Sequence, residues 1–188
     1  MDMKIIIEDT YEGMSRAAAD VIAEVVAAKP DCVLGLATGS TPIGLYAELV
    51  KDCAEGKISF ADVTSFNLDE YRGLAGDHVQ SYRYFMNDNL FDHVDIDKSR
   101  THVPDGTNPD AETVGAEYEE AIKQAGGVDI QLLGIGHNGH MASTSRATAS
   151  RRSPTWCSSP RAPSPRTAAC STPSTRCRVR PTPWASVP

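Results

Sequence analysis

The 188-residue chain divides at His140 into two parts of opposite composition. Residues 1–140 hold all 25 acidic residues but only ten of the 18 Lys and Arg, which argues against nucleic-acid binding by this part. The chain has no run of the roughly 20 apolar residues that a membrane span needs, so we expect a soluble, cytoplasmic protein. Its five cysteines follow neither zinc nor redox spacing, which is typical of a reducing compartment.

Short apolar runs alternate with helical patterns through residues 1–140, which favours a parallel sheet wrapped by helices. The sequence therefore predicts an α/β fold with an open, mainly parallel, Rossmann-like sheet and helices on both faces. Strands are expected at Lys4–Ile7, Cys32–Ala37, Val63–Leu68, Thr101–Val103 and Val128–Leu133. Helices are expected at residues 10–28, from Ile43 to Ala54, after Ser81, and from Asn108-Pro109 to Gly126-Gly127.

Three polar segments follow three of these expected strands, and ligands of open parallel sheets bind beyond the carboxyl ends of the strands. The first is Thr38-Gly39-Ser40-Thr41, between a strand and a helix. Backbone N–H groups and a helix dipole can face a phosphate in such a turn. The segment lacks the GKS/T ending of a Walker P-loop, and an ordinary helix-capping turn is the alternative.

The second segment, Asp69-Glu70-Tyr71, places two carboxylates side by side at a strand end. They can act as a general base, as metal ligands or as parts of a solvated turn. Neighbouring side chains of an extended backbone point to opposite sides, so only one carboxylate can face a pocket. Taken alone, this segment favours the solvated turn.

The third segment runs from Gly134 to His140. Its glycines allow close backbone approach to a ligand, and its histidines can transfer protons near neutral pH. His137 and His140 also suggest a metal site, but no Cys or carboxylate cluster supports it. We expect no metal, and we expect His137 to be the surface residue of the pair.

Together these segments resemble the glucosamine-6-phosphate deaminase family. The resemblance rests on the stretches LGLATGSTPIGLY (34–46), FNLDEYRGL (66–74), QSYRYFM (80–86), FDHV (91–94) and LLGIGHNGH (132–140). It covers almost all of residues 1–140, with three motifs in the family's order and spacing. It implies the family's α/β fold, incomplete at its C-terminal side.

The resemblance implies conversion of glucosamine 6-phosphate and water to fructose 6-phosphate and ammonia. It implies that the sugar phosphate is bound by Thr38, Gly39, Ser40 and Thr41. Asp69 would move a proton from C2 to C1, and His140, oriented with help from Asn138, would open the pyranose ring. The implied partner is a small-molecule amino-sugar phosphate, with no cofactor, nucleic acid or membrane, and homo-oligomerisation is left open for the full-length family member.

The resemblance stops at His140. The family continues with Ile-Gly-Phe-Asn-Glu-Pro-Gly, whose Glu completes the ring-opening group, whereas this chain continues with Met141 and Ala142. The codons of residues 141–147, read from the last base of the Met codon, can encode Gly-Phe-Asn-Glu-Pro-Gly. We therefore expect a single-base deletion near codon 141, after which residues 141–188 are out of frame. This tail carries eight Arg and eight Pro and almost no large apolar side chains, so we expect it to be disordered.

Two domain-level expectations follow. Residues 1–140 are the N-terminal part of a sugar-phosphate deaminase or isomerase domain, and residues 141–188 are a tail without the family's Glu, so we expect the chain itself to be inactive. The alternatives are a 6-phosphogluconolactonase-like or ribose-phosphate-isomerase-like enzyme of the same fold, or a non-functional fragment. For the tail, an arginine-rich nucleic-acid-binding arm is the alternative.

Overall fold

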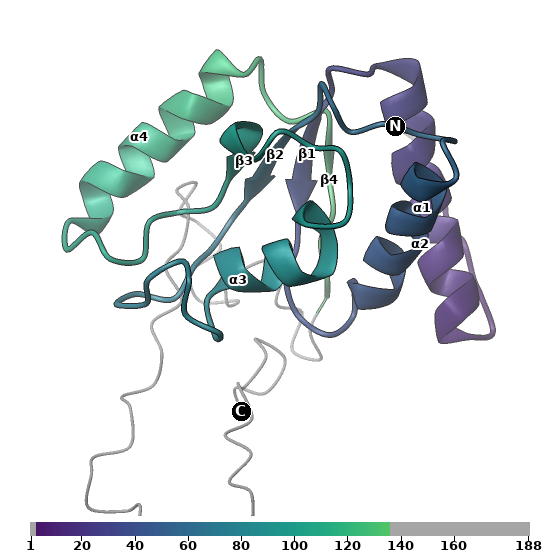
Figure 1. The fold of residues 1–188 in the computed structure, drawn as a ribbon, viewed down its shortest axis with the longest axis horizontal. Helices are drawn as coiled ribbons and strands as arrows, with labels where there is room; N and C mark the ends of the chain where they lie inside the picture. Colours follow the sequence, from purple (N-terminus) through teal and green to yellow (C-terminus); the bar gives the residue numbers. More distant parts are fainter. Residues whose placement is uncertain (1–2, 136–188) are drawn as a thin grey trace, which may run out of the picture.

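The computed structural model of the protein describes residues 3–135, apart from the side chains of residues 111 and 112. A parallel sheet in the order β3-β2-β1-β4 forms its centre (Figure 1). The strands are β1 (Val33–Leu36), β2 (Thr64–Asn67), β3 (Thr101–His102) and β4 (Ile130–Gln131). All three strand pairs are parallel, and Gly35 of β1 lies opposite Phe66 on one side and Gln131 on the other. The predicted α/β fold with an open parallel sheet is confirmed.

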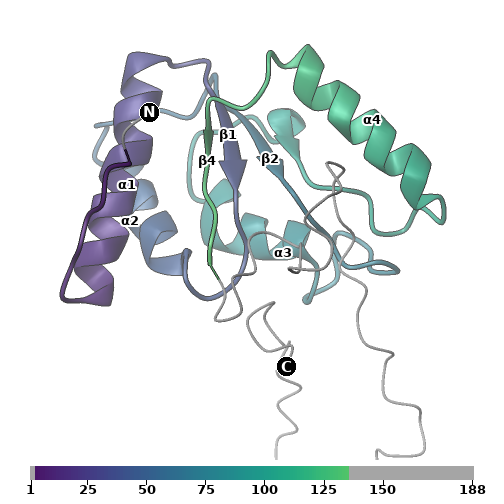
Figure 2. The same cartoon turned by 180° about the vertical axis from the view of Figure 1, so that it is seen from behind.

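Helices cover both faces of this sheet, as Figures 1 and 2 show. The helices are α1 (Tyr11–Ala28), α2 (Ile43–Ala54), α3 (Tyr82–Met86) and α4 (Ala111–Gln124), and a π-helical turn, Asn87–Phe91, continues α3. The larger core joins α1, α2 and α3 to the sheet through side chains such as Ile22, Leu49 and Met86. A smaller core on the opposite face packs Tyr118 of α4 against Val33 and Phe66.

Side-chain caps set the beginnings of three of these helices, with Thr10 at α1, Ser81 at α3 and Asp110 at α4. The Thr10 hydroxyl accepts the N–H of Gly13, so α1 begins one residue after the predicted start at residue 10. The carboxylate of Asp110 accepts the N–H of Thr113, and α4 begins at Ala111. The predicted start of α4 at Asn108-Pro109 is therefore a few residues too early, because Asp110 caps the helix.

The N-terminal segment Lys4–Ile7, predicted to be a strand, forms no strand in the structure. Its apolar side chains are largely in solvent, with Ile5 72% and Ile7 86% exposed. Figure 2 shows this segment, in the darkest purple, outside the sheet. Isoleucine favours extended backbone, but a strand also needs a neighbouring strand with which to pair. The strand prediction is wrong because the neighbouring strand would come from a distant part of the sequence, which the segment itself does not reveal.

β4 is shorter than the predicted strand at residues 128–133, although its pairing extends further. The N–H of Asp129 donates to the carbonyl of Val33, and the N–H of Leu132 donates to the carbonyl of Gly35. The chain therefore follows β1 closely up to the point where it enters the third polar segment. None of the helices in residues 3–135 is both long and apolar enough to cross a membrane.

Candidate active site

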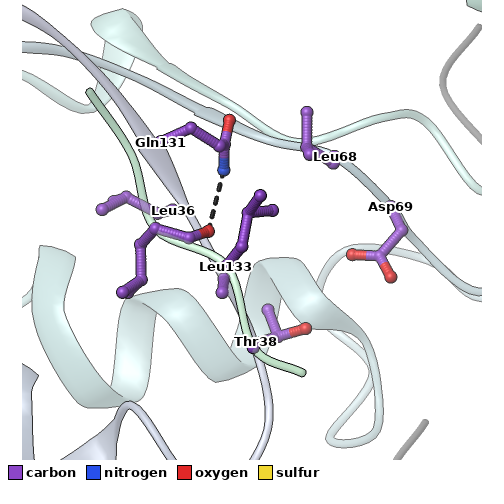
Figure 3. A pocket seen from close by; sticks show the side chains of 9 residues that line it. Leu36, Thr38, Leu68, Asp69, Gln131 and Leu133 are labelled. Carbon is purple, nitrogen blue, oxygen red and sulfur yellow. Dashed lines mark hydrogen bonds between the residues drawn. The ribbon is translucent and has the colours of Figure 1, made fainter. Parts of the chain in front are cut away.

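A pocket lies beyond the carboxyl ends of β1, β2 and β4 (Figure 3). Its lining residues are Leu36, Ala37, Thr38, Leu68, Asp69, Gln131, Leu132, Leu133 and Gly134. The chain leaves β1 toward β2 and β3 and then returns as β4 on the other side of β1. The pocket thus lies where the strand order reverses, which is the usual ligand position in open α/β sheets.

The turn between β1 and α2 brings the first predicted segment to this pocket. Thr38 is buried and lines the pocket, whereas Ser40 and Thr41 are exposed. Gly39 has a φ of 109°, a backbone conformation that glycine adopts without a steric penalty. The alternative interpretation of this segment was an ordinary helix-capping turn. The residue at the N-cap of α2 does not support it, because Pro42 makes no side-chain hydrogen bond there.

The carboxylate pair at the end of β2 is divided between two environments. Asp69 lines the pocket, and its carboxylate in Figure 3 turns toward Thr38 and Leu133. Glu70 is only 1% exposed and does not line the pocket. This division matches the prediction that only one of the two carboxylates faces a pocket. Asp69 is also the only ionisable side chain among the lining residues within the described part of the chain.

Glu70 holds the loop between β2 and α3 in place. Its Oε1 accepts the N–H groups of Tyr71 and Tyr82, at 2.7 and 2.8 Å, and its Oε2 accepts that of Arg83 at 3.0 Å. Burial raises the pKa of Glu70, while these three backbone N–H groups oppose that increase. Glu70 therefore joins the end of β2 to the first turn of α3, on the side of the backbone opposite to Asp69.

Buried hydrogen bonds also fix the strand ends beneath the pocket. The Nδ2 of Asn67 donates to the carbonyl of Leu36, at 3.1 Å, and so ties β2 to β1. The hydroxyl of Tyr118 reaches from α4 to the carbonyls of Asn67 and His102, at 2.7 and 2.9 Å. Burial raises the pKa of Tyr118, so the hydroxyl keeps its proton as a donor. The peptide that precedes Leu68 and Asp69 is thereby anchored to α4.

Only the beginning of the third predicted segment falls within the structure. Gly134 lines the pocket, while His137, Asn138 and His140 lie outside the described residues. Leu133 lies in the LLGIGHNGH stretch (132–140), whereas Gln131 is a lining residue that no sequence motif predicted. The signal for Gln131 was its position in the predicted strand at residues 128–133. In the described part of the chain, no group of three or more His, Cys, Asp or Glu side chains is arranged to hold a metal ion.

The fold and the pocket define a Rossmann-like α/β protein with a pocket between a hydroxyl-bearing turn and a carboxylate. Residues 8–172 match the family described as glucosamine-6-phosphate isomerases/6-phosphogluconolactonases. The chain belongs to this family, which confirms the resemblance found in the sequence.

Named relatives agree with this assignment. The glucosamine-6-phosphate deaminase of Clostridium tetani is 54% identical over 139 residues, which cover 74% of this chain and 58% of the relative. Glucosamine-6-phosphate deaminase 2 of Bacillus subtilis is 51% identical over 139 residues, covering 74% of this chain and 56% of the relative. The chain thus spans less than two thirds of the length of these relatives.

Solved structures show the same likeness. A monomeric glucosamine-6-phosphate deaminase has a TM-score of 0.72 and 45% identity, over 74% of this chain and 58% of that one. The 6-phosphogluconolactonase of Thermotoga maritima has a TM-score of 0.60 and 28% identity, over 74% of this chain and 62% of that one. Similarity in both sequence and structure is therefore higher to this deaminase than to this lactonase.

Proposed function

We propose that residues 1–140 are the N-terminal part of a glucosamine-6-phosphate deaminase. Such an enzyme converts glucosamine 6-phosphate and water to fructose 6-phosphate and ammonia. The observation that carries the proposal is the shared pocket of Thr38 and Asp69, at the reversal point of the sheet, in a chain 54% identical to a protein of that name. The substrate is accordingly a small amino-sugar phosphate.

In the proposed mechanism, the turn Thr38-Gly39-Ser40-Thr41 binds the sugar phosphate. It follows a buried strand and precedes the 12-residue helix α2, so the positive end of a helix dipole faces the turn. Hydroxyl groups of the turn can add charge-assisted hydrogen bonds to phosphate oxygens.

Asp69 is proposed to be the base that moves the proton. Its carboxylate removes the proton from C2 of the open-chain sugar and returns it at C1, so the amino sugar passes through an enolamine to an imine. Water then adds to the imine carbon and ammonia leaves, which gives the ketose phosphate. Glu70 has its carboxylate engaged by three backbone N–H groups and takes no part in this transfer.

The ring-opening step is assigned to the third segment. His140, oriented with help from Asn138, would move a proton between the C1 hydroxyl and the ring oxygen. All the proposed steps use acids and bases of the protein. Because phosphorylated sugars are charged and do not cross membranes unaided, we propose that the enzyme works in the cytoplasm.

We also propose that residues 141–188 are translated out of frame. The codon reading of residues 141–147 supports this proposal. The chain would then lack the family's ring-opening Glu. Resequencing the gene across codon 141 tests the frame: codons 141–147 that do not encode Gly-Phe-Asn-Glu-Pro-Gly when read from the last base of the Met141 codon would refute the deletion.

The activity itself is tested with two substrates. The gene with one base restored at codon 141 would be expressed, and its product assayed for ammonia release from glucosamine 6-phosphate and for hydrolysis of 6-phosphogluconolactone. We expect ammonia release and no lactone hydrolysis. Lactone hydrolysis without ammonia release would favour the lactonase, the second activity named in the family.

A further inference from the structure

Tyr11, the first residue of α1, reaches across to the turn between β1 and α2. Its hydroxyl lies 2.9 Å from the carbonyl oxygen of Thr41 and 3.3 Å from that of Ser40, and it can donate to either. The same hydroxyl oxygen accepts the N–H of Gly44, at 2.8 Å. One side chain from another helix therefore contacts both sides of Pro42, at the point where the turn becomes α2.

Gly44 makes this contact geometrically feasible. A Cβ atom at Gly44 would lie 2.4 Å from the Oγ of Ser15 and 2.8 Å from Cε1 of Tyr11. Only a residue without a side chain allows α1 to approach the start of α2 so closely. Figure 1 shows the two helices packed against each other on one face of the sheet.

The direction of these hydrogen bonds determines which backbone groups of the turn can face an anion. In a trans peptide, the C=O and N–H groups point in opposite directions. Because the Ser40 carbonyl faces Tyr11, the N–H of Thr41 in the same peptide faces away from α1. The carbonyl oxygen of Thr41, which would repel a phosphate, is likewise held toward α1. Tyr11 therefore favours the orientation of the turn in which a backbone donor is available and the carbonyl oxygens are withdrawn.

We propose that Tyr11 is a positioning residue that holds the Thr38–Thr41 turn in the orientation that binds the phosphate group of the substrate. This inference rests on the proposed function, because it takes the turn as the phosphate site. Tyr11 acts through the turn and does not itself touch the substrate. The first residue of α1 is thereby linked to substrate affinity.

The first test measures the turn without ligand, in the full 188-residue chain. Backbone amide hydrogen exchange would be compared in the wild type, Tyr11→Phe and the control Tyr84→Phe, which removes a hydroxyl from another partly exposed tyrosine. Loss of one hydrogen bond should speed exchange of the Gly44 amide by about 3- to 10-fold in Tyr11→Phe and leave it unchanged in Tyr84→Phe. Gly44→Ala, which separates α1 from α2, should have the same effect as Tyr11→Phe. Unchanged exchange at Gly44 in Tyr11→Phe would overturn the proposal.

The second test adds inorganic phosphate to the same proteins and follows the amide chemical shifts of residues 38–44. The apparent affinity should fall by about 3- to 10-fold in Tyr11→Phe and stay at the wild-type value in Tyr84→Phe. Equal affinity in Tyr11→Phe and the wild type, with faster exchange at Gly44, would refute the positioning role but leave the phosphate site intact. Absence of phosphate-dependent shifts in the wild type would refute the phosphate site and, with it, the role of Tyr11.

Discussion

Replacing Tyr118 by Phe isolates the contribution of one buried hydroxyl to the anchoring of β2, the strand that precedes Asp69. Tyr118 is 8% exposed, and its hydroxyl lies 2.7 Å from the carbonyl of Asn67 and 2.9 Å from that of His102. Its ring meets Phe66 edge-on, with centroids 5.6 Å apart and planes at 85°. Phenylalanine keeps this ring contact and removes only the hydroxyl, so the change probes hydrogen bonding without creating a large cavity.

The expected loss of stability follows from those bonds. A hydrogen bond contributes about 1 kcal/mol net, and a buried carbonyl left without its donor adds roughly another 1 kcal/mol. We therefore expect Tyr118→Phe to lower the free energy of unfolding by about 2 kcal/mol. Urea unfolding followed by circular dichroism measures it, with an unchanged slope as the sign that the folded state is otherwise intact. The control Tyr84→Phe should stay within about 0.5 kcal/mol of the wild type; the same small change in Tyr118→Phe would refute the anchoring role.

Three further substitutions test the backbone conformation of two glycines and the charge pair between Arg16 of α1 and Asp52 of α2. Gly39→Ala should destabilise the protein by about 1 kcal/mol because Gly39 has a φ of 109°, whereas Gly115→Ala, in the interior of α4 with open space around it, should stabilise it by about 0.5 kcal/mol. Equal changes in the free energy of unfolding for Gly39→Ala and Gly115→Ala, measured with urea, would contradict the argument from the backbone conformation of Gly39. The hydrogen bond from Arg16 lowers the pKa of Asp52 below 3.8, so the stability from this pair is present above pH 3.8 and is lost as the pH falls through the lowered pKa. Thermal unfolding measured between about pH 5 and about pH 2 tests this: Asp52→Asn should lose less stability over this range than the wild type. An identical dependence of stability on pH in the two proteins would show that the ion pair contributes nothing.

The sheet was predictable where burial is continuous along the sequence. β1 and β2 lie within one residue of the predicted bounds at each end: β1 is a short apolar run, and β2, with the sequence TSFN, lies between the apolar residues Val63 and Leu68. The segment Lys4–Ile7 has the same local character but forms no strand. Local propensity determines whether a segment can extend, while a neighbouring strand determines whether it pairs. That second condition cannot be read from the segment itself.

The candidate site was predictable to the extent that it depends on strand ends. Thr38 and Asp69 follow the adjacent parallel strands β1 and β2, so the fold brings them to one pocket. The contact of Tyr11 with the turn joins residues about 30 positions apart, and its only sequence signal was a tyrosine at the start of an amphipathic helix. The roles of Asn138 and His140 remain predictions, because both residues lie outside the described part of the chain.

The central claim is that residues 1–140 carry the proton-transfer base of a glucosamine-6-phosphate deaminase. Its most direct test is the rate of ammonia release by the product of the gene with its frame restored, compared with the same protein carrying Asp69→Asn. We predict a loss of about 10²- to 10⁴-fold in kcat, the usual contribution of a positioned base, and no measurable release by the 188-residue chain. Full turnover by Asp69→Asn would contradict the claim, whereas full turnover by the 188-residue chain would contradict the expected loss of activity with the out-of-frame tail.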